Sequence, residues 1–286
     1  AIGASALETN TTGASNVAVG RDSLKVNTTG LYNVAIGRDS LKANTTASNN
    51  TAVGYQPLLA NTTGTGNVSI GSYSLTTNTT ASNNTAVGVY ALRYNTTGAS
   101  NTAVGYQSLY ANTTGADNTS VGYLALGANT TGGSNTALGH NAMYEGVTTG
   151  SYNTMVGVSS GRKMTSGASN SGLGVNALES NTTGANNTGI GLSALAANTT
   201  GARNTAVGYH ALDSNTTANN NVAVGYDSLQ ANTTGTGNSA LGKDSLKATT
   251  TGTYNTALGV GALEVNTTAS YNTAVGGLAL LANTTG

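Results

Sequence analysis

The chain has 286 residues, a formal net charge of zero and only 7% charged residues. Nucleic acids and anionic membranes both require a basic face, so this composition argues against either as a partner. The chain contains no cysteine, which excludes a disulfide scaffold and thiolate metal sites. It also contains no apolar run of about 18 residues, so we predict no membrane insertion.

A single 17-residue unit fills the sequence. The copy at 101–117 reads Asn-Thr-Ala-Val-Gly-Tyr-Gln-Ser-Leu-Tyr-Ala-Asn-Thr-Thr-Gly-Ala-Asp, and we number its positions 1 to 17 from the first Asn. All steps between the opening asparagines are 17 except one of 18, and these asparagines are residues 16, 33, 50, 67, 84, 101, 118, 135, 153, 170, 187, 204, 221, 238, 255 and 272. A strict short period predicts an array in which each unit buries its apolar face against its neighbours. We expect residues 1–286 to form one array of about 17 turns, cut inside a copy at both ends.

The first part of each copy predicts a short strand. Positions 2 to 5 read Thr/Val-Ala-Val-Gly, an extended run bounded by Asn and Gly. Position 4 is Val, Ile or Leu in every copy and position 9 is Leu in nearly all, so we predict that both lie in the core. Charges enter at positions 6, 7 and 10, as in Arg21, Asp22 and Lys25, which predicts that these positions face solvent.

The second part predicts a turn. In Asn-Thr-Thr-Gly, Asn and Gly tolerate left-handed backbone angles and Thr hydroxyls can satisfy turn amides. Seventeen residues are too few for a βαβ unit, which needs about 30. The fold class we predict is all-β, a parallel β-solenoid (β-roll) of 17-residue turns, with a helical turn near Ser-Leu-x-x-Asn. Strands about 4.8 Å apart would make a rod about 80 Å long.

The core of each turn is thin. One Val, Ile or Leu, one Leu and some Ala bury little apolar area against the entropy of ordering a whole turn. We therefore favour several copies of the chain around a shared axis, as a homotrimer or a filament. A single-chain solenoid held by Asn and Thr ladders is the alternative.

Two consecutive copies, residues 135–169, depart from the pattern. The first carries the one inserted residue, at 142–147, and we expect it to bulge outward because the register resumes at 148–150. The second has Gly161 where Leu belongs and Met164 where the turn Asn belongs. Loss of the Leu side chain predicts a weak or bent point here.

The motifs that resemble catalytic or cofactor sites fall on the repeat itself. The G-x-S-x-G match at 157–161 and the G-x-G-x-x-A matches at 172–177 and 189–194 lie in register with the other copies, without the helix that each motif requires. His140 and His210 stand four copies apart and cannot share a metal. We predict no catalytic, cofactor-binding or metal-binding residue and no enzyme activity.

The Asn-Thr-Thr triplets are also acceptors for N-glycosylation. Their asparagines are Asn10, Asn27, Asn44, Asn61, Asn78, Asn95, Asn112, Asn129, Asn181, Asn198, Asn215, Asn232, Asn266 and Asn283. Glycans on every turn would be crowded at about 5 Å spacing, and turn chemistry already explains the triplet. Stacked threonines leave an ice-binding surface as a further alternative.

The motif Asn33-Val34-Ala35-Ile36-Gly37 and its counterparts resemble the head repeats of trimeric autotransporter adhesins of the YadA type. The full unit is similar to repeats of phage, especially cyanophage, tail-fibre proteins. The resemblance covers the whole chain and implies an extracellular, cell-surface or virion fibre, homotrimeric, with a host-surface glycan or receptor as its ligand. It transfers no functional residues.

We therefore predict a structural shaft segment of a tail fibre or adhesin, acting as a stiff spacer or adhesive rod. The alternatives are a self-assembling extracellular filament subunit and an ice-binding β-solenoid.

Overall fold

The computed structural model describes residues 1–284, and this part of the chain is all-β, without any helix. The contacts group the chain into two compact units. Unit 1 comprises Ala1–Asn141 with Val147–Thr149, and unit 2 comprises Ala142–Gly146 with the residues from Gly150 on. The boundary falls in the copy that carries the inserted residue. That all copies form one array stays a prediction.

Each complete copy contributes one three-residue strand at positions 2 to 4. In unit 1 these are β1 (Val17–Val19), β2 (Val34–Ile36), β3 (Thr51–Val53), β4 (Val68–Ile70), β5 (Thr85–Val87), β6 (Thr102–Val104), β7 (Thr119–Val121) and β8 (Thr136–Leu138). In unit 2 they are β9 (Thr154–Val156), β10 (Ser171–Leu173), β11 (Thr188–Ile190), β12 (Thr205–Val207), β13 (Val222–Val224), β14 (Ser239–Leu241), β15 (Thr256–Leu258) and β16 (Thr273–Val275).

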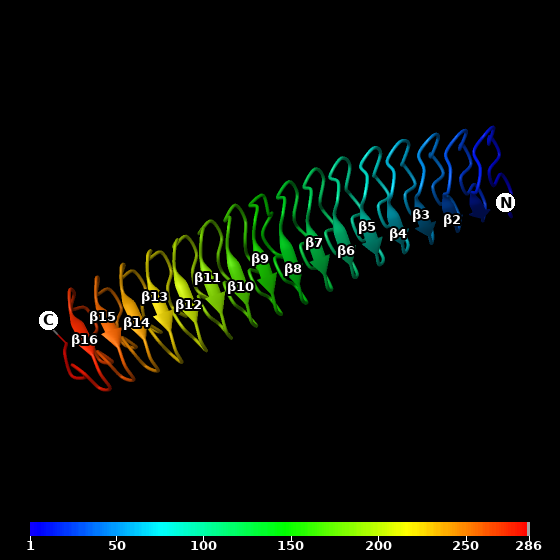
Figure 1. The fold of residues 1–286 in the computed structure, drawn as a ribbon. Helices are drawn as coiled ribbons and strands as arrows, with labels where there is room; N and C mark the ends of the chain where they lie inside the picture. Colours follow the sequence, from blue (N-terminus) through cyan, green and yellow to red (C-terminus); the bar gives the residue numbers. More distant parts are fainter. Residues whose placement is uncertain (285–286) are drawn as a thin grey trace. The chain divides into compact units, whose positions relative to one another are not determined.

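Within each unit, consecutive strands pair in parallel with the repeats in register. Ala86 lies opposite Ala103, and Val87 opposite Val104, in the β5–β6 pair. Figure 1 shows the strand arrows of each unit side by side, with the rest of every turn looping round behind them. The predicted fold class, a parallel β-solenoid with one 17-residue copy per turn, is confirmed.

The prediction that position 4 lies in the core is wrong. Position 3 is buried in all sixteen strands, whereas positions 2 and 4 are half-buried or exposed. Ala103 is fully buried, while Leu173 at position 4 is 51% exposed. Successive side chains of a strand point to opposite faces, so a buried position 3 places its two neighbours outside. Position 3 is Ala, Ser or Gly in every strand except β9, where it is Met155.

The prediction for position 9 is confirmed between the terminal copies, since Leu109 and the equivalent leucines from Leu24 to Leu263 are fully buried. The backbone there is left-handed, with φ of 53° at Leu109, and position 7 shares this conformation, with φ of 50° at Gln107. A left-handed leucine costs about 1 kcal/mol, which its burial offsets. The left-handed residues are therefore at positions 7, 9 and 17, and not in Asn-Thr-Thr-Gly, and the expected helical turn is a tight non-helical bend.

Two columns of buried asparagines close most turns, one at position 1 and one at position 12, where Met164 and Thr249 are among the exceptions. In the copy 101–117, the amide nitrogens of Asn101 and Asn112 both donate to the carbonyl oxygen of Gly115, each over 2.9 Å. Asn112 Nδ2 also donates to Asn95 Oδ1 of the preceding turn over 2.8 Å. The backbone amide of Asn101 donates to Asn84 Oδ1 over 2.9 Å. The same side chains therefore close one turn and bind it to the next.

Glycine at position 5 is required by close approach of the backbones. Gly105 has φ of 132°, and a Cβ placed on it would lie 2.3 Å from the carbonyl oxygen of Gly122 in the next turn. Any side chain here would push the turns apart, which explains why no copy departs from glycine.

In the second irregular copy, another side chain fills the core space that Gly161 leaves without a leucine. Met155 occupies position 3, where other copies carry a small residue, and it is fully buried. A Cβ on Gly161 would lie 2.9 Å from Met155 Cγ, so this methionine takes the space of the missing leucine. A Cβ on Gly172, at position 3 of the next copy, would lie 2.6 Å from Met155 Sδ. The three residues thus share the core space of the missing leucine, and the expected weak or bent point in this copy stays a prediction.

The inserted residue in the first irregular copy lies outside. Val147 is 60% exposed, whereas Met143 and Thr148 on either side are fully buried. The expected outward bulge is confirmed.

The alternation of the strand predicts opposite effects for two adjacent substitutions. Ala103→Asp should lower the free energy of unfolding by several kcal/mol, because a carboxylate would be buried without a partner. Val104→Asp should leave the thermal unfolding of an isolated chain within about 0.5 kcal/mol of the parent, since this side chain points outward. Circular dichroism melting at low protein concentration compares them, and equal losses at both sites would contradict the assigned faces.

Because Met155 fills the space beside Gly161, substitutions at these two residues should have non-additive effects on the free energy of unfolding. Met155→Ala should cost about 2–5 kcal/mol by opening a cavity. Gly161→Leu alone should also destabilise, because the leucine would collide with Met155. The double variant should recover most of the loss, since leucine already adopts this left-handed backbone at position 9 of other copies. Chemical denaturation measures all three, and additive losses would show that the two sites are not coupled.

Candidate interaction surfaces

Surface variation is concentrated at a few positions of an otherwise repetitive framework. Positions 1, 3, 5, 9 and 12 change little between copies, because each is fixed by packing or hydrogen bonding. Positions 6, 7, 10 and 11 follow the strand and change from copy to copy. Position 17 also varies, and it carries Tyr32, Asp117 and Arg203 among others. The four positions that follow the strand carry most of the charged residues, and we call them the variable column.

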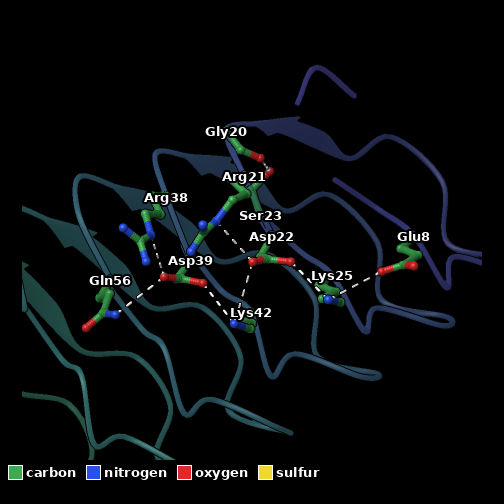
Figure 2. A network of polar contacts seen from close by, with 10 residues as sticks. All are labelled: Glu8, Gly20, Arg21, Asp22, Ser23, Lys25, Arg38, Asp39, Lys42 and Gln56. Carbon is green, nitrogen blue, oxygen red and sulfur yellow. Dashed lines mark hydrogen bonds and ion pairs between the residues drawn. The ribbon is translucent and has the colours of Figure 1, made fainter. Parts of the chain in front are cut away.

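The first turns of the variable column carry a network of ion pairs. Lys25 Nζ lies 3.0 Å from Asp22 Oδ1 in its own turn and 3.5 Å from Glu8 Oε2 in the preceding one. Lys42 Nζ lies 2.9 Å from Asp39 Oδ1 and 3.8 Å from Asp22 Oδ2. Figure 2 shows the side chains converging from successive turns, so that each lysine joins two carboxylates. The network therefore adds links between turns outside the core.

Position 7 is less exposed than predicted. Asp39 is only 3% exposed and Asp227 only 6% exposed. The prediction that positions 6 and 10 face solvent is confirmed by exposed Arg21 and half-exposed Lys25, but position 7 lies beneath them. The left-handed backbone at position 7 explains this, because it turns the side chain along the surface.

The contacts of Asp22 and Asp39 lower the pKa values of both carboxyl groups. The hydrogen bond from Lys25 holds the pKa of Asp22 below its usual value. Burial opposes ionisation of Asp39, but hydrogen bonds from Lys42 and Gln56 outweigh it and lower its pKa. The Asp-Ser-Leu-Lys sequence recurs in unit 2, where Lys247 Nζ lies 2.9 Å from both Asp227 and Asp244. Hydrogen bonds to both carboxylates raise the pKa of Lys247.

The next turns of unit 1 replace charges by aromatic rings. Successive ring centroids lie 5.1 to 6.1 Å apart along Tyr55, Tyr73, Tyr90, Tyr106, Tyr123 and His140. Several pairs stack nearly parallel, with an interplanar angle of 14° between Tyr106 and Tyr123. One ring per turn is what an in-register solenoid imposes, and stacking at this spacing is favourable. The rings stay at the surface, with Tyr106 41% exposed.

The outward side of the strands is a second surface, and it is uncharged. In every strand position 4 is Val, Ile or Leu, and position 2 is Thr, Val or Ser. Many of these aliphatic side chains are well exposed, among them Ile36, Ile70, Leu138, Leu173, Ile190, Leu241 and Leu258. The eight strands of each unit make an aliphatic column about 35 Å long at a spacing of about 4.8 Å. The sequence analysis did not find this surface, because it placed position 4 in the core.

The predicted glycosylation asparagines are mostly inside the fold. All are fully buried except Asn10 and Asn283, which belong to the first and last copies. In the buried ones Nδ2, the atom that would carry a glycan, donates to the carbonyl of position 15, as in Asn27 to Gly30 over 3.1 Å. A glycan on such a nitrogen would compete with these buried hydrogen bonds, and glycosylation at the asparagines stays a prediction.

The two threonine columns on which the ice-binding alternative rests differ in whether their hydroxyls are already hydrogen-bonded. The position 13 hydroxyls donate to the next turn, as in Thr113 Oγ1 to the carbonyl of Thr130 over 3.0 Å. Position 14 is exposed, as at Thr114. Where these bonds form, the position 13 hydroxyl is already used within the solenoid, and ice binding stays an untested alternative.

The residues of the catalytic look-alike motif are not assembled into a site. Ser159 lies at position 7 with φ of 56°, the conformation of that position in other copies. His140 stacks on Tyr123 in unit 1, and His210 lies 3.8 Å from Asp227 in unit 2. Absence of enzyme activity stays a prediction.

Over residues 1–284 the structure has no pocket and no group of three His, Asp or Glu side chains able to hold a metal. The same residues include no helix of the length and apolarity needed to cross a bilayer.

Neither protein-family models nor curated proteins give a match to this chain. The surfaces described above are therefore the basis for a functional proposal.

The lowered aspartate pKa values predict a pH dependence of stability. A carboxylate whose pKa is lower in the folded state stabilises the fold above its unfolded pKa of about 3.9 and loses that contribution as pH falls through the folded value. The melting temperature should therefore fall between about pH 5 and pH 2, and Asp39→Asn should flatten this part of the profile. Exposed Asp117, which lies outside the network, provides the control substitution Asp117→Asn. Identical profiles for both variants would contradict a role of the network.

Proposed function

We propose that the chain is a structural segment of a fibre on the outside of a cell or a virion, in which copies of the chain associate side by side through the aliphatic column of position 4. The observation that carries the proposal is this column, which repeats in every strand and leaves Val, Ile and Leu side chains at the surface.

An exposed aliphatic surface of this kind supports association. Monomeric soluble proteins rarely expose contiguous apolar patches larger than a few hundred Å², and larger ones mark interaction sites. In each unit the column runs along eight strands with no charged residue at positions 2 or 4. Covering it would add buried apolar area to turns whose own core consists of little more than one leucine and one alanine.

A second copy of the chain is the partner that matches this surface. Its own column is uncharged and has the same spacing, so each aliphatic side chain can enter the gap between two turns of the neighbour. Symmetric self-association is also the commonest form of assembly among soluble proteins. A closed trimer and an open filament are the two arrangements we propose, and both bury the same column.

The resemblance to adhesin heads and phage tail fibres supports an external fibre. The balance of charges agrees with a structural role, because it offers no extended basic surface for nucleic acid. In such a fibre the segment acts as a stiff spacer, since the asparagine columns link successive turns within each unit, and as an adhesive rod through its variable column.

Light scattering tests the assembly. The parent chain should have about three times its mass of 28.1 kDa, or an open-ended mass in a filament. A variant with aspartate at Val53, Val87, Val104 and Val121 should associate more weakly than the parent, because the carboxylates would face one another along unit 1 while the column of unit 2 is unchanged. Its circular dichroism spectrum should match that of the parent.

The matched control places aspartate at four exposed threonines of the same turns, Thr63, Thr97, Thr114 and Thr131. It adds the same charge and should keep the assembly. A parent chain that stays monomeric at all concentrations would refute the proposed association.

A further inference from the structure

Arg93 lies among tyrosines in the variable column of unit 1. It follows the buried Leu92, which fixes the start of its side chain at the surface. The centre of its guanidinium lies 5.3 Å from the ring centroid of Tyr73, 4.9 Å from that of Tyr90 and 5.2 Å from that of Tyr94. Three rings from two successive turns therefore hold one cation by cation–π contacts.

The tyrosines extend this cluster along the solenoid. The ring of Tyr110 lies 4.9 Å from that of Tyr94, and their hydroxyl oxygens are 3.4 Å apart. Tyr94 is 40% exposed and Tyr106 is 41% exposed. The surface around Arg93 therefore combines phenol hydroxyls, ring edges and one positive charge, all accessible from solvent.

The charge of Arg93 has no carboxylate to balance it among the residues that the structure describes. No other charged residue occurs between Lys42 and Asp117 in the sequence. The arginines in the ion-pair networks differ: Arg38 pairs with Asp39, and Arg162 pairs with Glu145 and Glu179. The exposed positions of the neighbouring turns could accept an acidic residue, yet none carries one.

We propose that Arg93 and the tyrosines around it bind an acidic saccharide, meaning a sugar that bears a carboxylate or a sulfate. The planar guanidinium can donate paired hydrogen bonds to either anion. The exposed phenol groups can hydrogen-bond to sugar hydroxyls, and their ring edges can pack against the apolar face of the sugar.

A single cation among uncharged aromatic groups selects this ligand over other anions. Nucleic acids draw their affinity from many phosphate contacts, which one arginine does not provide. An acidic peptide offers fewer hydroxyls to the tyrosines than a saccharide does. The site lies on an open surface, so each site binds weakly and a repeating saccharide gains from several weak contacts along the aromatic column.

This inference names the ligand for the adhesive part of the proposed function, but it does not depend on self-association, since Arg93 lies in the variable column and not on the aliphatic one. Isothermal titration of the full chain with a galacturonic acid trisaccharide and with a sulfated galactose trisaccharide tests it. A neutral galactose trisaccharide is the control probe. We expect saturable binding of at least one acidic probe and at least about tenfold weaker binding of the neutral one.

Arg93→Gln should weaken binding of the acidic probe about tenfold or more, with an unchanged melting temperature, because the side chain lies at the surface. The affinity of Arg93→Lys, which keeps the charge but not the planar guanidinium, should lie between those of the parent and Arg93→Gln. Arg203→Gln removes an exposed arginine that contacts Asn220 and should leave binding unchanged.

Absence of binding for both acidic probes, or equal binding by the parent and Arg93→Gln, would overturn the site. Light scattering on the same samples reports self-association separately. A loss of saccharide binding with intact assembly, or the reverse, therefore distinguishes failure of this site from failure of the proposed association.

Discussion

The buried asparagine at position 12 is the interaction on which the rest of the structure depends. Its Nδ2 donates both to the carbonyl of position 15 in its own turn and to the asparagine of the preceding turn, as in Asn112 with Gly115 and Asn95. Asn101 donates to the same carbonyl from the other side of the turn. A buried amide left without partners costs about 1–3 kcal/mol, so these side chains penalise any turn that slips out of register. In the copy where Thr249 takes position 12, Asn232 Oδ1 of the preceding turn has no hydrogen-bond donor within residues 1–284. The column is therefore complete only where asparagine follows asparagine in successive turns.

This internal bonding changes how the aliphatic residues are used. With the turns closed by amides, the core needs only a leucine at position 9 and a small residue at position 3. The branched residues at position 4 are then left on the outside, where they can contact a neighbouring chain. In the association that we propose, stability within one chain and contact between chains rest on different residues, and the variable column is free to differ from turn to turn. The charged network near Asp39 and the aromatic cluster near Arg93 are two uses of that freedom.

Much of the fold could be predicted from the sequence, because a 17-residue period with Gly at position 5 and Leu at position 9 fits few architectures besides a β-solenoid. The sequence analysis placed position 4 in the core because that position is aliphatic in every copy. Successive side chains of a strand point to opposite faces, so either position 3 or position 4 can lie inside, but not both. Gly161 was interpreted as a lost side chain because Met155 is remote from it along the turn, and only the fold brings the two together. The surroundings of Arg93 were equally hidden, since Tyr73 and Tyr90 become its neighbours only when the turns stack.

The most direct measurement of the central claim is the unfolding free energy of Asn112→Asp. The substitution keeps the shape of the side chain but replaces the donor nitrogen with an oxygen that faces two acceptor oxygens. We predict a loss of about 3–5 kcal/mol, because a buried charge would lack its hydrogen bonds. Asn49→Asp, at exposed position 17 of the same unit, should change stability by less than about 0.5 kcal/mol. If the two variants unfold alike, the asparagine columns do not hold the solenoid together.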